Sequence, residues 1–407
     1  MAYNRKQRLN DNIKAIETAF ILDREQRTPT ARERLLLERY CGFGGLKCIL
    51  NPARELADAV HWAKSDLELF APTVELHRLI RENSKNESEY KQLMDSLKQS
   101  VLTAFYTPSA ITEALTDVLK EHQIIPEKVL EPSAGIGAFV DSVLDNNPKA
   151  DIMAFEKDLL TGKILHHLHP EQKVRIEGFE KIEKPFNDYF DLAISNIPFG
   201  DVAVFDPSYT AMKGMRALVT RRIHNYFFVK ALDTVRDGGL VAFITSQGVL
   251  NAKNNSAARF MMLYHADLVS AIRLPNNLFT ENANTEVGSD LIILQKNSQK
   301  ESLRGDDNLL DTVYNDENRI PTNNYFLEHP ERIIHTTAKL DTDPFGKPAM
   351  IYTHEDGVEG IAEDLRKMLH EDFKKNLNLN RYLGIEETKA EEVKEVEETE
   401  KIEKTEK

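Results

Sequence analysis

The pattern of apolar and polar positions changes along the chain near residue 100. Before it, apolar residues such as Ile13, Ile16 and Phe20 recur at helical spacing, which predicts a helical segment. From Thr107 onward, short apolar runs alternate with helical patterns, which favours a parallel sheet with helices on both faces. We expect seven strands, at 128–131, 151–156, 174–177, 191–195, 240–245, 268–274 and 290–296. The sequence therefore predicts an α/β fold preceded by helices.

This pattern divides the 407 residues into four parts. Residues 1–100 are expected to form an N-terminal helical cap, 101–296 the α/β domain, 297–385 an irregular polar extension and 386–407 a tail. The tail holds ten Glu and five Lys and almost no apolar residue, so we expect it to be disordered. No apolar run approaches the roughly 18 residues of a membrane-spanning helix. These features predict a cytoplasmic protein without a membrane partner.

The net charge of −14 argues against a nucleic-acid partner only if its distribution is ignored. The segment from Ser208 to His224 contains no acidic residue, but it carries Lys213, Arg216, Arg221 and Arg222. Cations grouped in this way can contact phosphates from a loop over a substrate. A solvated surface excursion is the alternative.

A glycine-rich turn follows the first predicted strand, in the sequence VLEPSAGIGAF that begins at Val129. In an open parallel sheet the ligand crevice lies beyond the carboxyl ends of the strands, where Gly135 and Gly137 would let a ligand approach the backbone. The spacing matches neither the dinucleotide nor the triphosphate motif. Glu156 ends the next strand, and a carboxylate there can accept hydrogen bonds from both ribose hydroxyls of an adenosine. An ordinary turn beside an exposed acid is the alternative.

Two further segments supply candidate contacts to such a ligand. Thr107 and Pro108 can cap a helix and leave a hydroxyl and backbone groups facing the crevice, although a plain helix start is the alternative. After the third strand, Glu180 can accept from an adenine amino group, with Glu177 as a competing candidate. The histidines at 166, 167 and 169 have no set of Cys or carboxylate residues beside them, so no metal site is expected.

The fourth predicted strand ends in Asn196, Ile197, Pro198 and Phe199. An amine attached to a nucleobase or an amide is a poor nucleophile, because its lone pair is delocalised, and it must be oriented before it attacks. The Asn196 side-chain carbonyl and a backbone carbonyl can accept its two hydrogens, and Phe199 offers a face to a flipped-out base. Pro198 biases Ile197 toward an extended conformation. Beside the glycine turn, this segment predicts methyl transfer to a planar nitrogen.

The order of these motifs resembles that of the adenine-specific, amino-methylating DNA methyltransferases, in particular a mobile-element-associated branch with an NxPF motif. The resemblance covers about residues 103–296. It implies a class I methyltransferase-like (Rossmann-like) sheet of seven mostly parallel strands, S-adenosylmethionine as cofactor, DNA as partner and adenine as methyl acceptor, as in restriction-modification systems. The implied cofactor residues are Thr107, Pro108, Glu131, Pro132, Gly135, Gly137, Glu156 and Glu180. The implied catalytic residues are Asn196, Ile197, Pro198 and Phe199, with Lys213, Arg216, Arg221 and Arg222 on the DNA.

Two departures from the family pattern leave other functions open. Ile197 stands where the family has its first proline, although the backbone oxygen thought to accept from the amine is unaffected. No large target-recognition domain follows the last strand, so specificity is either low or supplied by a separate specificity or helicase-like partner. The alternatives are methylation of RNA or of a protein glutamine, and a catalytically silent, cofactor-binding antirestriction protein.

Overall fold

A computed structural model describes residues 4–103, 106–212, 214–280, 286–303, 307–314, 320–343 and 346–385. Its centre is one seven-stranded sheet in the order β3-β2-β1-β4-β5-β7-β6. β7 runs antiparallel to both of its neighbours, and the other pairs are parallel. The strands are β1 (Lys128–Glu131), β2 (Asp151–Phe155), β3 (Lys173–Arg175), β4 (Phe190–Asn196), β5 (Val235–Ser246), β6 (Ala266–Leu274) and β7 (Ser289–Lys296).

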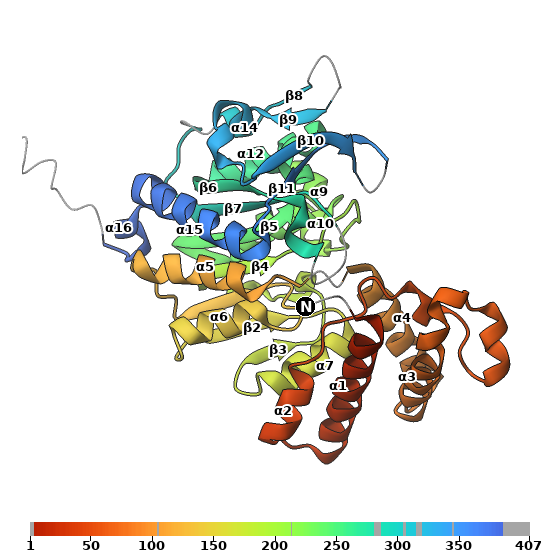
Figure 1. Cartoon of the computed structure of the whole chain (residues 1–407). Helices are drawn as coiled ribbons and strands as arrows, with labels where there is room; N and C mark the ends of the chain where they lie inside the picture. Colours follow the sequence, from red (N-terminus) through yellow and green to blue (C-terminus); the bar gives the residue numbers. More distant parts are fainter. Residues whose placement is uncertain are drawn as a thin grey trace, which may run out of the picture.

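Helices cover both faces of this sheet (Figure 1). Most residues of the central strands β4 and β5 are buried, as expected for strands covered on both faces. One face packs against α5 (Ser109–Glu121), α6 (Ala138–Asn146) and α15 (Gly357–Asn376). The other face packs against α10 (Ile223–Thr234) and α12 (Ser256–His265). The expected class I methyltransferase-like fold is therefore confirmed.

The N-terminal helices share a hydrophobic core with α7 (Leu159–Leu168), the helix that follows β2. They comprise α1 (Arg5–Glu25), α2 (Ala31–Leu37), α3 (Phe70–Glu82) and α4 (Glu87–Thr103). A second turn, at residues 41–45, contains Gly42, Gly44 and Gly45. Buried Asn12 of α1 fixes this turn, because its side-chain amide donates to the Gly42 carbonyl at 2.7 Å and its side-chain oxygen accepts from the Cys41 N–H at 2.9 Å. This turn is therefore a structural corner of the helical segment.

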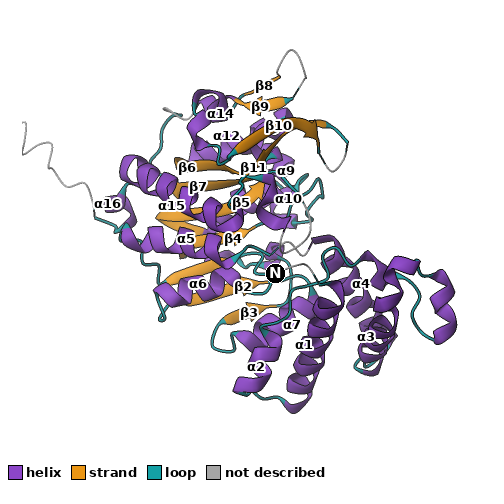
Figure 2. Ribbon diagram, in the orientation of Figure 1, coloured by secondary structure: helices purple, strands orange, loops and turns teal. Residues whose placement is uncertain are grey.

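The remaining elements are short (Figure 2). After β4 come α8 (Pro207–Thr210) and α9 (Met215–Val219), and after β5 comes α11 (Gly248–Asn251). Two antiparallel strand pairs follow the sheet, β8 (Thr312–Tyr314) with β9 (Pro321–Asn323), and β10 (Thr337–Thr342) with β11 (Pro348–Thr353). The last helices are α14 (Asn324–Glu328) and α16 (Leu379–Tyr382). Within the described residues, no helix combines the length and apolar character needed to cross a membrane.

The segment 297–385 differs from the irregular extension that we expected. It contains the 20-residue helix α15, whose buried Ile361, Leu365 and Leu369 belong to the core beneath the sheet. Their spacing of four residues is helical, but charged residues separate them, so the apolar stripe is narrow. The acidic tail at 386–407 lies outside the described residues.

Candidate active site at the carboxyl ends of the strands

The carboxyl ends of β2, β1 and β4 lie side by side, because these three strands are parallel neighbours. Glu131, the last residue of β1, is in register with Ala154 of β2, and β1 pairs on its other side with β4. Glu156 therefore follows β2 on one side of Glu131, and Asn196 ends β4 on the other. The expected cofactor acids and the expected amine-holding asparagine meet at one edge of the sheet.

Two hydrogen bonds hold the glycine turn after β1 against the end of β2. The Ala134 N–H donates to the Phe155 carbonyl, and the Gly135 N–H donates to the Glu156 carboxylate, each at 2.8 Å. Gly135 has a φ of +55°, and a Cβ at this position would lie 2.8 Å from the Tyr106 ring. Only glycine therefore fits between the turn and this ring.

The other end of the turn is equally close-packed. Gly137 precedes α6 with a φ of +91°, and a Cβ there would lie 2.7 Å from the His169 ring. Pro132 is buried. His169 is itself buried, 3.6 Å from the Asp141 carboxylate, and burial lowers its pKa to about 4. The turn is thus fixed by packing from α7 as well as by its own backbone.

Two acids at this edge are strongly desolvated. Burial raises the pKa of Glu131 to about 8, with a contribution from Glu156, while the Ser195 hydroxyl and the Ser133 amide oppose the shift. Neither carboxyl oxygen of Glu131 has a well-formed hydrogen bond with any described residue. Burial also raises the pKa of Glu156 to about 7. Desolvated acids of this kind favour a ligand that carries positive charge or hydrogen-bond donors.

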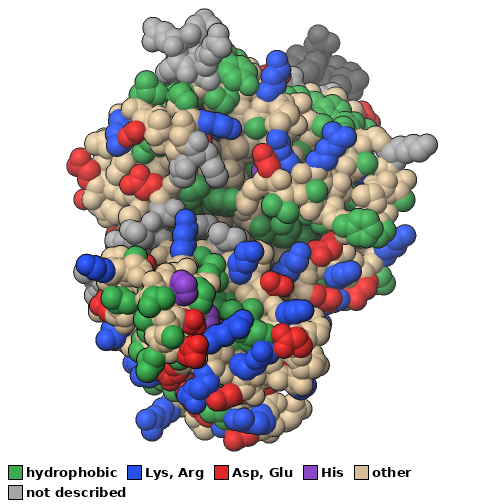
Figure 3. All heavy atoms as spheres, turned by 90° about the vertical axis from the view of Figure 1, so that its right-hand side faces the viewer, with side chains coloured by type: hydrophobic (Ala, Val, Ile, Leu, Met, Phe, Trp, Pro, Cys, Tyr) green, Lys and Arg blue, Asp and Glu red, His purple; other side chains and the backbone are tan. Residues whose placement is uncertain are grey.

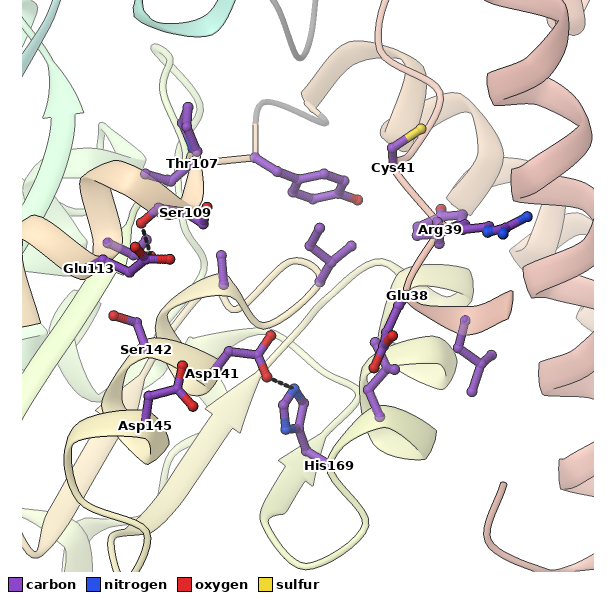
Figure 4. A pocket seen from close by; sticks show the side chains of 18 of the residues that line it. Glu38, Arg39, Cys41, Thr107, Ser109, Glu113, Asp141, Ser142, Asp145 and His169 are labelled. Atoms are coloured by element: carbon purple, nitrogen blue, oxygen red, sulfur yellow. Dashed lines mark hydrogen bonds and ion pairs between the residues drawn. The ribbon is translucent and has the colours of Figure 1, made fainter. Parts of the chain in front are cut away.

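A cavity of about 680 Å³ opens beside the glycine turn (Figure 4). Thr107 and Pro108 line it, together with residues of α6 and of the segment after α2. α5 begins at Ser109, with Pro108 in the N-cap position and no side-chain cap. We expected Thr107 to cap this helix, and that expectation is wrong. We also missed Tyr106 as a lining residue. Tyr106 directly precedes Thr107 in the sequence, and this position could have indicated that it lines the same cavity.

Glu180 and its competitor differ in their surroundings. The Glu177 carboxylate forms an ion pair with Arg175 at 2.5 Å. Glu180 lies half-buried in the short helix after Gly178, with its carboxylate folded over that glycine. Phe179 between them is fully buried, and its ring lies 5.8 Å from that of Phe155, so it belongs to the core of the sheet.

The segment from Asn196 to Phe199, which we expect to hold the amine, continues the ladder of β4. The Ile197 N–H donates to the Ile244 carbonyl of β5 at 3.0 Å, and the Ile197 side chain is 1% exposed. Phe199 is half-buried, with its ring in an edge-on contact 6.4 Å from that of Phe279. A proline at 197 could not make this hydrogen bond, because it has no N–H. The isoleucine therefore anchors the segment that carries Asn196 and Pro198.

Replacing Ile197 by proline is expected to destabilise the protein by about 2–4 kcal/mol, because it removes one buried hydrogen bond and much of a buried aliphatic side chain. Ile197→Val keeps the N–H and should cost only about 0.5–1.5 kcal/mol. Urea unfolding of both variants measures the difference. Equal stabilities would show that the backbone bond does not anchor the segment.

Two of the cations expected on DNA are engaged within the protein. Arg216 makes a two-pronged ion pair with Asp233, and Arg222 contacts Asp201 at 2.8 Å. Arg221 is exposed. Lys213 lies outside the described residues. The loop therefore offers less free positive charge than its composition indicates.

A sheet of this order, with one antiparallel strand and a glycine turn after β1, is the fold of class I methyltransferases. The profile of the family "N-6 DNA Methylase" matches residues 88–391. The chain belongs to this family and carries a DNA methyltransferase module. S-adenosylmethionine is the methyl donor of the family, so the expected cofactor is confirmed at the level of the family.

Two curated relatives match shorter segments. "Defense against restriction protein B" of Escherichia phage P1 is 29% identical over 201 residues, which cover 48% of this chain and 8% of the relative. "Type II methyltransferase M.XamI" of Xanthomonas campestris pv. amaranthicola is 25% identical over 173 residues, covering 39% of this chain and 33% of the relative. The chain thus spans only a small part of the first relative and about a third of the second.

Among solved structures, a Listeria monocytogenes protein described as a class I S-adenosylmethionine-dependent methyltransferase matches with a TM-score of 0.43 and 15% identity. The match covers 74% of this chain and 91% of that protein.

Proposed function

We propose that this protein transfers a methyl group from S-adenosylmethionine to the exocyclic amino group of adenine in DNA. The observation that carries the proposal is the position of Asn196, Pro198 and Phe199 at the end of β4, next to the desolvated Glu131 at the end of β1. An amine-holding segment beside a site for a cationic ligand is what direct methyl transfer requires.

The cofactor residues fit S-adenosylmethionine. Glu131 has two buried oxygens that lack well-formed hydrogen bonds with any described residue, and the ammonium group of the cofactor would supply both charge and donors. Glu156 accepts from two backbone amides, and its remaining lone pairs suit the ribose hydroxyls. Thr107 would face the methionine carboxylate, and Glu180 the adenine ring. Gly135 and Gly137 keep the turn close to this ligand.

S-adenosylmethionine, when bound, would supply an electrophilic methyl carbon to the amino nitrogen, with its sulfur as the leaving group that keeps the bonding electron pair. The protein's part is to orient the acceptor. The Asn196 side-chain carbonyl and the backbone carbonyl of Ile197 accept the two amino hydrogens, which aims the nitrogen lone pair. The nitrogen then loses one proton to solvent. No protein nucleophile is needed.

Adenine in a duplex cannot reach this segment while it is stacked, so the base must turn out of the helix. The half-exposed face of Phe199 would then hold the base by stacking. The experiment is incubation of the protein with methyl-labelled S-adenosylmethionine and unmethylated genomic DNA, followed by nucleoside analysis. Label in N6-methyladenine supports the proposal. Cofactor binding without label in the adenine of DNA would overturn it.

A second function is favoured by one comparison, the match to "Defense against restriction protein B". In this case the domain would bind the cofactor without methylating DNA. Methylation of RNA or of protein glutamine uses the same planar amine and would appear as label in those substrates. We also propose that a specificity or helicase-like partner acts with this methyltransferase module, which the two curated relatives match over 8% and 33% of their own lengths.

Replacing Phe199 by alanine should weaken capture of the flipped base by about 1–3 kcal/mol, which corresponds to a roughly 5- to 150-fold rise in the KM for DNA. Phe199→Tyr keeps the ring and should stay near the wild-type value. Steady-state kinetics with both variants measure the effect, and cofactor affinity serves as the check on folding. An unchanged KM in the alanine variant would remove Phe199 from the base pocket.

A further inference from the structure

The loop after β4 exposes an unusual amount of apolar surface. Phe205 is 79% exposed and is, within the described part of the chain, the most exposed phenylalanine. Other exposed apolar side chains of the same loop are Val202, Met212, Met215 and Leu218. Groups of exposed apolar residues on one segment are typical of contact surfaces rather than of ordinary solvated loops.

The backbone on both sides of Phe205 is firmly held. The Val204 N–H donates to the Thr220 carbonyl at 2.8 Å, which joins the two ends of the loop. Asp206 is 3% exposed and accepts from the Tyr226 hydroxyl at 2.7 Å and from Lys230 at 3.3 Å. An aromatic ring projecting from a fixed backbone loses little conformational entropy when it is buried against a partner.

The charges of this loop are largely neutralised. Arg216 and Arg222 are paired with Asp233 and Asp201, so Arg221 is the exposed cation of the loop among its described residues. The contact surface is therefore apolar, with a cation at its margin. Such a composition suits insertion between bases better than a run of phosphate contacts.

Phe205 is also tied to the base-holding segment. Six positions separate it from Phe199, so the two Cα atoms are at most about 22 Å apart. Hydrophobic side chains gather around the hollow that divides the sheet-containing part from the helical part, with Lys and Arg scattered near it (Figure 3). A ring this near to Phe199 along the chain would be within reach of the DNA from which the pocket draws a base.

We propose that Phe205 inserts into the base stack and fills the space left by the flipped adenine. The inference rests on the proposed function. Apolar side chains inserted between base steps offset part of the cost of unstacking, and the gap exists only in a duplex. Phe205 is thus a positioning residue for duplex substrate, and it does not take part in methyl transfer itself.

The test compares Phe205→Ala with wild type on native and on heat-denatured unmethylated DNA, with labelled S-adenosylmethionine. We expect methylation of the duplex to fall at least about tenfold and that of single strands to change less than about twofold. Tyr264→Ala removes an exposed aromatic ring from α12 and is the matched control, expected to act like wild type on both substrates. Cofactor affinity and melting temperature should be unchanged in both variants.

Phe205→Leu and Phe205→Ser provide a second readout that does not need activity on single strands. Leucine still fills the gap and should restore most of the duplex activity, whereas serine should not. Equal duplex activity of Phe205→Ala and wild type would overturn the wedge alone and indicate another use of the surface, such as a protein partner. The wedge would also be overturned if Phe205→Ala lost activity equally on both DNA forms, or if the wild-type protein methylated only single strands. A wild type that methylates neither DNA form would overturn the proposed function as well.

Discussion

Replacing Asn196 by alanine is expected to lower the rate of adenine methylation at least about 100-fold, while cofactor binding stays within about twofold. The side-chain carbonyl would accept a hydrogen bond that strengthens as the amino nitrogen begins to share its lone pair, so its loss acts mainly on the transition state. Single-turnover methylation of DNA with labelled S-adenosylmethionine measures the rate. Equilibrium dialysis with the same cofactor measures binding.

The matched control is Asn187→Ala, because Asn187 is an exposed asparagine just before the opposite end of the same strand. It should leave both rate and binding at wild-type values. If Asn196→Ala methylates DNA as fast as wild type, the amine is held elsewhere and the proposed role of the segment fails. If cofactor binding is also lost, the asparagine supports the cofactor site instead.

The sheet was predictable because its signals are local. Each central strand is a short apolar run, and the glycine turn and the acids stand directly at strand ends, so Glu131, Glu156 and Asn196 could be placed on one edge from the sequence. A segment that packs on the sheet from far along the chain gave a weaker signal. The helix α15 lies far from β1 along the chain, and its apolar stripe is too narrow to indicate burial, although α5 and β6 cover it in the fold.

Contacts between residues that are distant in the sequence explain which features of the site could not be predicted. Arg216 reads as a free cation, yet Asp233 of α10 lies beside it in the folded chain. The ring of Tyr106 covers Gly135 through a tertiary contact that no spacing rule predicts. The sequence shows how many charged and aromatic side chains are present, but the ion pairs and packing of the folded protein determine which of them a ligand can contact.

Glu131→Gln is expected to weaken cofactor binding at least about tenfold near pH 8, because an amide cannot replace the charge of a carboxylate facing an ammonium group. The pKa of Glu131 is raised to about 8, so a proton must leave before the cation binds. Wild-type affinity should therefore fall by up to about tenfold for each pH unit below 8. The glutamine variant should show a much weaker dependence between pH 6 and pH 8, measured by calorimetry.

The raised pKa of Glu131 also changes stability in a defined direction. It rises from 4.5 in the unfolded chain to about 8 in the fold, so the contribution of this group to stability is complete below pH 4.5 and is lost as pH rises to 8. Without cofactor, the free energy of unfolding of Glu131→Gln should therefore rise relative to that of wild type between pH 5 and pH 8, by up to about 1.4 kcal/mol for each pH unit. Glu127→Gln, beside the exposed start of β1, is the control and should show no such gain. Unfolding free energies that change equally with pH in all three proteins would show that Glu131 is ionised and stabilised by the protein itself. The reason for placing a cationic ligand beside it would then be removed.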